Sequence, residues 1–176
     1  MNLPNKLTLA RMIAVPFFIA AFMLDYNIVA LVLFIAASVT DYFDGKIARE
    51  RGLVTNFGKI MDPLADKILV YSALCLFLED GIIAGWMFIL ILAREFIVAG
   101  MRTVSASEGK VLAAGMSGKI KTVLQMIAVC LIMLGLAVES VPQILLAGKI
   151  VFYASLVMTV YSGAEYVIKN KEVFSM

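Results

Sequence analysis

The sequence contains no histidine, and this absence removes two common kinds of chemistry. Histidine is the usual general base near neutral pH and the most frequent zinc ligand. Acid–base chemistry in this chain therefore has to use carboxylates, lysines or tyrosines. A metal site would be lined by oxygen atoms, which favours Mg²⁺, Mn²⁺ or Ca²⁺.

Cysteine is also scarce: the chain has Cys75 and Cys130, and no Cys-x-x-Cys pair. Each cysteine lies in an apolar run, so we expect two buried free thiols and no zinc or redox motif. Linkers, low-complexity tracts and sequence repeats are missing as well. We therefore expect residues 1–176 to form a single domain.

Polar residues are few over most of the chain, which is 62% hydrophobic and has a mean hydropathy of +0.98. The apolar runs do not alternate with polar residues, as the strands of an outer-membrane barrel would. A membrane-spanning helix needs about 20 apolar residues. Six segments come near this length: 8–24, 27–49, 61–79, 82–103, 119–138 and 143–168. The sequence thus predicts an all-α membrane protein with six transmembrane helices.

Positive charge is unevenly distributed along the chain. Three short connections contain acidic residues but no Lys or Arg: 25–27, 79–81 and 139–142. All 15 Lys and Arg residues except Lys149 lie at the amino-terminus, in two longer polar regions or in the tail. The positive-inside rule therefore places both termini and both longer connections in the cytoplasm. Six spans agree with this, because an even number returns the chain to its starting side.

Acidic residues gather in one stretch, "TDYFDGKIARERGLVTNFGKIMDPLADKI" (residues 40–68). It contains four aspartates: Asp41, Asp44, Asp62 and Asp66. Residues three or four apart share a helix face, so the first pair forms one acidic stripe and the second pair another. Gly45 and Ala48 continue the first stripe, and Gly58 begins the second. Such small residues let a ligand approach the backbone closely.

These aspartates need a stabilising environment. A charge at the centre of a membrane helix costs about 2.5–3.5 kcal/mol, so four unpaired charges would cost on the order of 10 kcal/mol. Divalent cations relieve the repulsion among converging carboxylates and take oxygen ligands. The alternative is pairing on a solvated loop with the neighbouring cations Arg49, Arg51, Lys59 and Lys67. The small residues on the same stripes favour a shared polar cavity.

The pattern Asp41-x2-Asp44-Gly45-x2-Ala48-Arg49-x8-Gly58-x3-Asp62-x3-Asp66 resembles the signature of the CDP-alcohol phosphotransferases at every fixed position. Three further segments resemble the branch of that family that makes phosphatidylglycerol phosphate. They are "NLPNKLTLAR" (2–11), "AREFIVAGMR" (93–102) and "GKIKTVLQM" (118–126). The resemblance covers nearly the whole chain.

The resemblance implies a homodimeric, multi-pass enzyme of the bacterial cytoplasmic membrane, surrounded by membrane lipids, with its active site facing the cytoplasm and no nucleic-acid partner. It would join CDP-diacylglycerol to sn-glycerol 3-phosphate and release CMP. The four aspartates would hold two divalent cations, Mg²⁺ or Mn²⁺, and Asp66 would also be the general base. The implied nucleotide-binding residues are Asn5, Thr8, Asp44, Gly45, Ala48, Arg49 and Gly58.

An acceptor that carries a phosphate needs a cationic pocket. Four candidates lie on the expected cytoplasmic side: Arg94, Arg102, Lys119 and Lys121. Arg94 interrupts an apolar span, where a charged residue indicates function, and the planar arginine fork suits phosphate. Glu95 either orients Arg94 or only pairs with it. For Lys119 and Lys121 the alternative is simple anchoring at the membrane surface.

Other functions fit parts of the pattern. The same family could use inositol phosphate, serine or phosphatidylglycerol as the acceptor. A cation-coupled transporter could also use acids within the membrane, but transporters often contain inverted repeats and bind near the midplane. We see no corresponding halves in this sequence, and its four aspartates cluster toward one face. A soluble-type prenyl synthase is excluded by the hydropathy.

Overall fold

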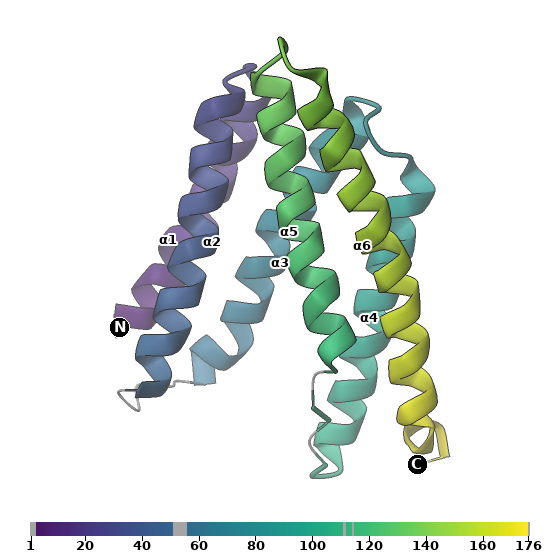
Figure 1. Cartoon of the computed structure of the whole chain (residues 1–176). Coiled ribbons are helices and arrows are strands. Elements are labelled where there is room, and N and C mark those ends of the chain that lie inside the picture. Colours follow the sequence, from purple (N-terminus) through teal and green to yellow (C-terminus); the bar gives the residue numbers. More distant parts are fainter. Residues whose placement is uncertain (1–2, 51–55, 111, 114, 176) are drawn as a thin grey trace.

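The computed structural model describes residues 3–50, 56–110, 112–113 and 115–175; for 3–6, 41–50, 56–60, 62–63, 66 and 174–175 it describes the backbone alone. These ranges form six α-helices and a terminal 3-10 helix, with no strand among them (Figure 1). The elements are α1 (Leu3–Met23), α2 (Asn27–Glu50), α3 (Asn56–Glu79), α4 (Gly85–Ser107), α5 (Met116–Ala137), α6 (Pro142–Lys169) and η1 (Lys171–Ser175). The chain is all-helical, as predicted.

Each predicted span overlaps one helix, and two helices begin well before the predicted residue. α1 begins at Leu3 and α3 at Asn56, each five residues before the expected start at residue 8 or 61. Hydropathy detects where an apolar run begins, whereas a helix continues through polar residues as long as its backbone hydrogen bonds are made. Pro63 consequently lies inside α3.

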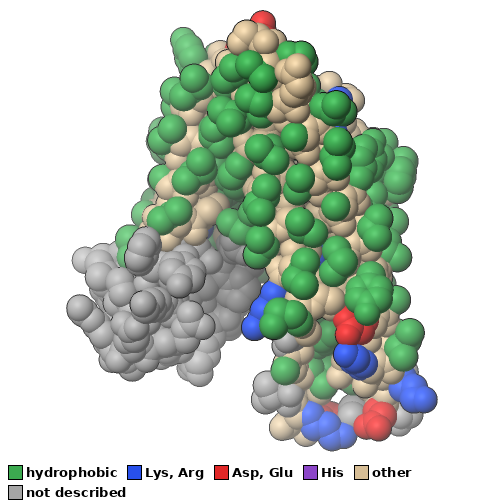
Figure 2. Space-filling model, in the orientation of Figure 1, with side chains coloured by type: hydrophobic (Ala, Val, Ile, Leu, Met, Phe, Trp, Pro, Cys, Tyr) green, Lys and Arg blue, Asp and Glu red, His purple; other side chains and the backbone are tan. Residues whose placement is uncertain are grey.

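Membrane character is clearest in the last two helices. Within the described ranges, α5 and α6 are long and apolar enough to cross a membrane, and α1 and α2 contain the shorter apolar stretches Leu7–Met23 and Asn27–Thr40. Large apolar side chains such as Phe17, Phe96 and Val157 are exposed, and Figure 2 shows hydrophobic side chains over much of one face. So much exposed apolar surface is expected of a protein surrounded by lipid.

The helices alternate in direction between two ends of the molecule. In Figure 1 the three short turns, α1–α2, α3–α4 and α5–α6, lie at the upper end. Both termini and the helix ends that lead into the two longer connections lie at the lower end. Asp25 and Gly81, in two of the upper turns, adopt positive φ angles of 60° and 68° that reverse the chain tightly. We call the lower end, where most of the charged side chains in Figure 2 gather, the polar end.

The core consists of apolar side chains from all six helices. Phe18, Phe34, Phe77 and Phe152 are almost completely buried, and the ring centroids of Phe18 and Phe34 lie 5.9 Å apart. The expectation of two buried thiols is wrong for Cys75, which is exposed on α3, while Cys130 is partly buried. An apolar run in a membrane protein covers both the core-facing and the lipid-facing sides of a helix, so hydropathy does not distinguish them.

α5 and α6 form the most extensive helix pair. A Cβ atom added at Gly135 would lie 2.6 Å from the backbone of Leu145, and one at Gly148 would lie 2.8 Å from the backbone nitrogen of Ile132. Glycines of this kind let the backbones of membrane helices touch. The two glycines thus position the hairpin whose polar end contributes to the site described below.

Candidate functional site

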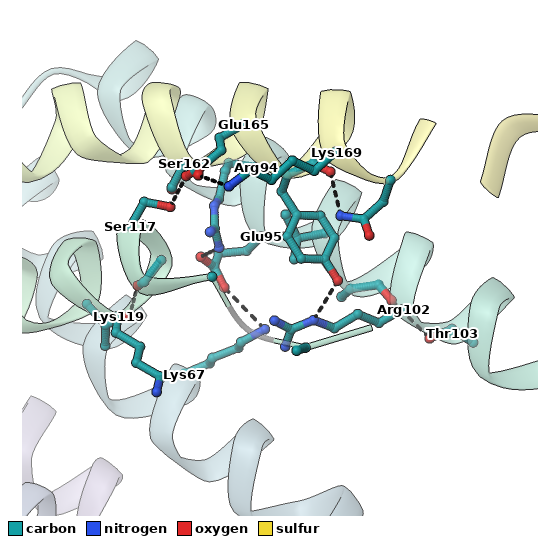
Figure 3. Close-up of a pocket in the computed structure, with 18 of the residues that line it drawn as sticks. Lys67, Arg94, Glu95, Arg102, Thr103, Ser117, Lys119, Ser162, Glu165 and Lys169 are labelled. Atoms are coloured by element: carbon teal, nitrogen blue, oxygen red, sulfur yellow. Dashed lines mark hydrogen bonds and ion pairs between the residues drawn. The ribbon is translucent and has the colours of Figure 1, made fainter. Parts of the chain in front are cut away.

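A pocket of about 970 Å³ opens at the polar end, between α3, α4, α5 and α6 (Figure 3). Its charged lining residues are Lys67, Arg94, Glu95, Arg102, Lys119, Glu165 and Lys169. Five of these seven side chains are cationic. The pocket therefore suits an anionic ligand.

Glu95 lies at the centre of an ion-pair cluster on one side of the pocket. Its Oε1 atom accepts hydrogen bonds from Lys121 Nζ at 2.6 Å and from Arg94 Nη1 at 2.8 Å. Its Oε2 atom lies 3.3 Å from Lys67 Nζ. Three cations from α3, α4 and α5 thus share one carboxylate, which leaves a formal charge of +2. We call these four residues the Glu95 cluster.

Arg94 is enclosed between α5 and α6. A Cβ atom at Gly118 would lie 3.0 Å from Arg94 Nη2, and one at Gly163 would lie 2.9 Å from Arg94 Cγ. These glycines leave the space that the arginine occupies. Its Nε atom is buried and has no hydrogen-bond partner within the described part of the chain. The guanidinium group therefore keeps an unused donor beside the pocket.

Arg102 is held on the opposite side of the pocket by Tyr166. The Nε atom of Arg102 donates to Tyr166 Oη at 3.1 Å, and the guanidinium carbon lies 5.4 Å from the centroid of the tyrosine ring. Tyr166 is buried, whereas Arg102 is exposed. The hydrogen bond to Tyr166 uses only the Nε atom of Arg102. Both terminal nitrogens of the guanidinium group can therefore donate to a ligand.

Glu165 connects the beginning of α5 with the end of α6. It accepts a hydrogen bond from Ser117 Oγ and another from Lys169 Nζ, the latter at 2.5 Å. Ser117 belongs to the first turn of α5, a turn whose Gly115 cap supplies no side-chain hydrogen bond. Lys119 lines the same part of the pocket and is exposed.

Three of the four predicted acceptor residues, Arg94, Arg102 and Lys119, line this pocket. Lys121 lies behind the lining, with a side chain only 4% exposed and paired with Glu95. Anchoring of Lys121 at the membrane surface is therefore wrong, because its ammonium group points into the protein.

Lys67, Glu165 and Tyr166 also line the pocket, and sequence reasoning did not identify them as pocket residues. A signal did exist on α6, where Ser162, Glu165, Tyr166 and Lys169 recur at spacings of three and four. These spacings place polar groups on one helix face within an otherwise apolar segment.

The four aspartates lie on two helices that meet at the polar end. Asp41 and Asp44 belong to the last part of α2, and Asp62 and Asp66 to the first part of α3. Their side chains lie outside the described residues, as do those of Asn5, Gly45, Ala48, Arg49 and Gly58. In the part that is described, no three Asp, Glu or Cys residues form a metal-binding group. The backbone nevertheless brings both acidic stretches to the end that carries the pocket.

The amino-terminal helix contributes buried polar groups at this end. Thr8, one of the predicted nucleotide-binding residues, is 1% exposed, and Arg11, one turn further on, is 2% exposed. α1 packs against α2 and α3, the two helices that carry the aspartates. Arg11 was not among the predicted site residues, although its charge within an apolar helix was a visible signal.

Fold and pocket together define an all-helical membrane-type protein with a cationic site beside two aspartate-bearing helices. Residues 1–161 match the CDP-alcohol phosphatidyltransferase family, and the chain belongs to this family.

Curated relatives resemble the chain over nearly its whole length. A Bacillus subtilis (strain 168) protein named CDP-diacylglycerol–glycerol-3-phosphate 3-phosphatidyltransferase is 41% identical, over 97% of this chain and 96% of its own. A Rickettsia felis protein of the same name is 36% identical, over 98% of this chain and 97% of its own. A Mycobacterium tuberculosis (strain H37Rv) protein named probable phosphatidylglycerophosphate synthase is 37% identical, over 96% of this chain and 81% of its own.

Proposed function

We propose that the chain transfers the phosphatidyl group of CDP-diacylglycerol to the primary hydroxyl of sn-glycerol 3-phosphate and releases CMP. The observation that carries this proposal is the cationic pocket at the end where α2 and α3 meet, in a chain of this family. The names of the relatives described above specify the same reaction for those proteins.

The pocket's charge suits the phosphate of the acceptor. A phosphate monoester carries about −1.5 to −2 charges near pH 7, which the +2 of the Glu95 cluster would balance. Arg94 and Arg102 would bind its oxygens through planar, multiple hydrogen bonds, and Lys119 and Lys121 would add point charges. A neutral acceptor would leave these charges unbalanced.

The four aspartates, Asp41, Asp44, Asp62 and Asp66, fit two divalent cations. Their carboxylates offer the oxygen ligands that Mg²⁺ and Mn²⁺ prefer, from two helices whose backbones converge at the polar end. Bound there, the cations would neutralise charge on the diphosphate of the substrate. The proposed nucleotide pocket adds Asn5, Thr8, Gly45, Ala48, Arg49 and Gly58, whose small members leave room for the cytidine.

Asp66 would serve as the general base of the reaction. It would accept the proton of the acceptor hydroxyl while the hydroxyl oxygen bonds to the lipid-linked phosphorus and the bond from that phosphorus to CMP breaks. A carboxylate is the natural choice in a chain without histidine. Lys67, which directly follows Asp66 in α3, lines the acceptor pocket, so the base would lie close to the acceptor.

The proposal includes a single domain over residues 1–176 that crosses the bacterial cytoplasmic membrane six times. Both termini and the active site would face the cytoplasm, and two copies would form a homodimer. The exposed apolar surface and the positions of the three short turns at one end support the membrane arrangement. The acyl chains would lie along apolar helix surfaces at the level of the bilayer.

A CMP-release assay tests the acceptor. Purified protein with CDP-diacylglycerol and Mg²⁺ is given sn-glycerol 3-phosphate, inositol phosphate, serine or phosphatidylglycerol, one at a time. We expect CMP release to rise with sn-glycerol 3-phosphate and to stay near background with serine, a zwitterion whose net charge of zero cannot balance the cationic pocket. A response to another acceptor alone would refute the choice of substrate. If none of the four acceptors causes CMP to be released, the result would favour the transporter alternative.

A further inference from the structure

A single buried carboxylate organises the cationic side of the pocket. We propose that Glu95 is a positioning residue, which holds Lys67, Arg94 and Lys121 in the arrangement that receives the acceptor's phosphate. This inference rests on the proposed function and assigns to Glu95 a role that the four-aspartate signature does not include.

The stoichiometry of the Glu95 cluster argues against a simple structural ion pair. One cation is enough to neutralise a carboxylate, yet three lie within 2.6–3.3 Å of Glu95. The side chains of Arg94 and Glu95 are only 13% and 12% exposed, so their charges are weakly screened by the solvent. Excess positive charge in such a place is costly unless an anion binds there. Among the side chains that the structure describes, the +2 charge of the cluster is therefore balanced only when a dianion is added.

The cluster also joins helices that otherwise touch little. α3 packs mainly against α1, and it meets α4 and α5 over few residues. The contact of Lys67 with Glu95 crosses this small interface. Lys67 directly follows Asp66, so the carboxylate on α4 fixes where the proposed base-bearing segment of α3 stands relative to the pocket.

Removal of the carboxylate charge should spoil this arrangement. In Glu95→Gln the side chain keeps its size, but the three cations repel one another and buried Lys121 loses its counter-charge. The phosphate would then meet cationic groups that are no longer held in one arrangement. Binding of CDP-diacylglycerol, which the proposal assigns to α1, α2 and α3, should change little.

The test compares Glu95→Gln with Glu139→Gln, the same change at an exposed turn at the opposite end of the molecule. CMP release is measured while each substrate is varied in turn. We expect Glu95→Gln to raise the KM for sn-glycerol 3-phosphate by about ten- to a hundredfold and that for CDP-diacylglycerol by less than about twofold. Glu95→Asp, which restores the charge on a shorter side chain, should recover part of the loss. Glu139→Gln should match the wild type.

Several outcomes would overturn the inference. An unchanged or lowered KM for sn-glycerol 3-phosphate in Glu95→Gln would mean that the carboxylate is irrelevant or competes with the phosphate. Equal increases in both KM values, with a lower unfolding temperature, would make Glu95 purely structural.

Two further measurements keep the test decisive. If Glu95→Gln does not fold, the variant Lys67→Met is used instead, because it leaves the pair of Lys121 with Glu95 intact. We expect Lys67→Met to raise the KM for sn-glycerol 3-phosphate but not the KM for CDP-diacylglycerol. A wild-type protein that ignores sn-glycerol 3-phosphate would overturn the proposed function, and this inference with it. An active wild type with an insensitive Glu95→Gln variant would overturn only the inference.

Discussion

At the scale of single residues, the pocket depends on pairs that are distant in sequence. Arg94 was identifiable because it is a charge in an apolar span, and adjacent Glu95 was an obvious companion. Lys67 could not be identified as a pocket residue from the sequence, because its contact with Glu95 depends on how α3 packs beside α4. Tyr166 resembles any aromatic residue of an apolar helix until its hydroxyl is seen beside Arg102.

Tyr166→Phe tests whether Tyr166 holds Arg102 in place. The change keeps the ring beneath the guanidinium and removes only the hydroxyl that accepts the Nε hydrogen bond. We expect the KM for sn-glycerol 3-phosphate to rise about three- to tenfold, as for loss of one hydrogen bond of about 1 kcal/mol, with an unchanged KM for CDP-diacylglycerol. Tyr153→Phe, at an exposed position on the same helix, is the control. If Tyr166→Phe and this control have the same KM for sn-glycerol 3-phosphate, Tyr166 does not contribute to acceptor binding.

At the scale of helices, hydropathy and charge predicted which segments are helical but not where all of them begin. The two largest differences, at Leu3 and Asn56, lie in polar sequence where hydropathy gives no signal. The sequence also did not indicate the close approach of α5 and α6. Nothing local distinguishes Gly135 and Gly148 from other glycines in an apolar run, but in the structure each lies against the backbone of the other helix.

Gly148→Leu should separate α5 from α6. The added side chain meets the backbone of Ile132, which cannot move aside as a flexible side chain would. We expect a loss of about 1–3 kcal/mol in the free energy of unfolding, the usual cost of overpacking. Thermal unfolding in one detergent compares it with Gly100→Leu on α4, where an added Cβ has nothing within 4 Å. Equal stability of the two variants would contradict the close contact.

At the scale of the whole molecule, alternating helices bring chemistry from separate parts of the chain to one end. α2 and α3 carry the aspartates, α1 adds buried Thr8 and Arg11, and α3 to α6 form the cationic pocket. The even number of helices places both termini at this end as well (Figure 1). One end can therefore hold a nucleotide-linked lipid and a phosphorylated acceptor side by side.

Removal of divalent cations should abolish turnover reversibly. With EDTA in excess, the four carboxylates would repel one another and the diphosphate would lose its counter-charge. We expect CMP release to fall to background and to return when Mg²⁺ or Mn²⁺ is added back. Helical content, followed by circular dichroism, should not change, because the core consists of apolar side chains from all six helices and includes none of the four aspartates. Full activity in EDTA would contradict the metal proposal.

The sequence by itself determined the helical membrane class, the approximate helical segments and the family. Hydropathy, charge distribution and a motif of fixed spacing are all local properties of the chain. Only the tertiary structure decided that Lys67, Glu95 and Lys121 meet, that Tyr166 holds Arg102, and that Cys75 faces outward. The physical reason is that these contacts depend on the rotation and separation of packed helices, which side-chain volumes across the whole interface set together.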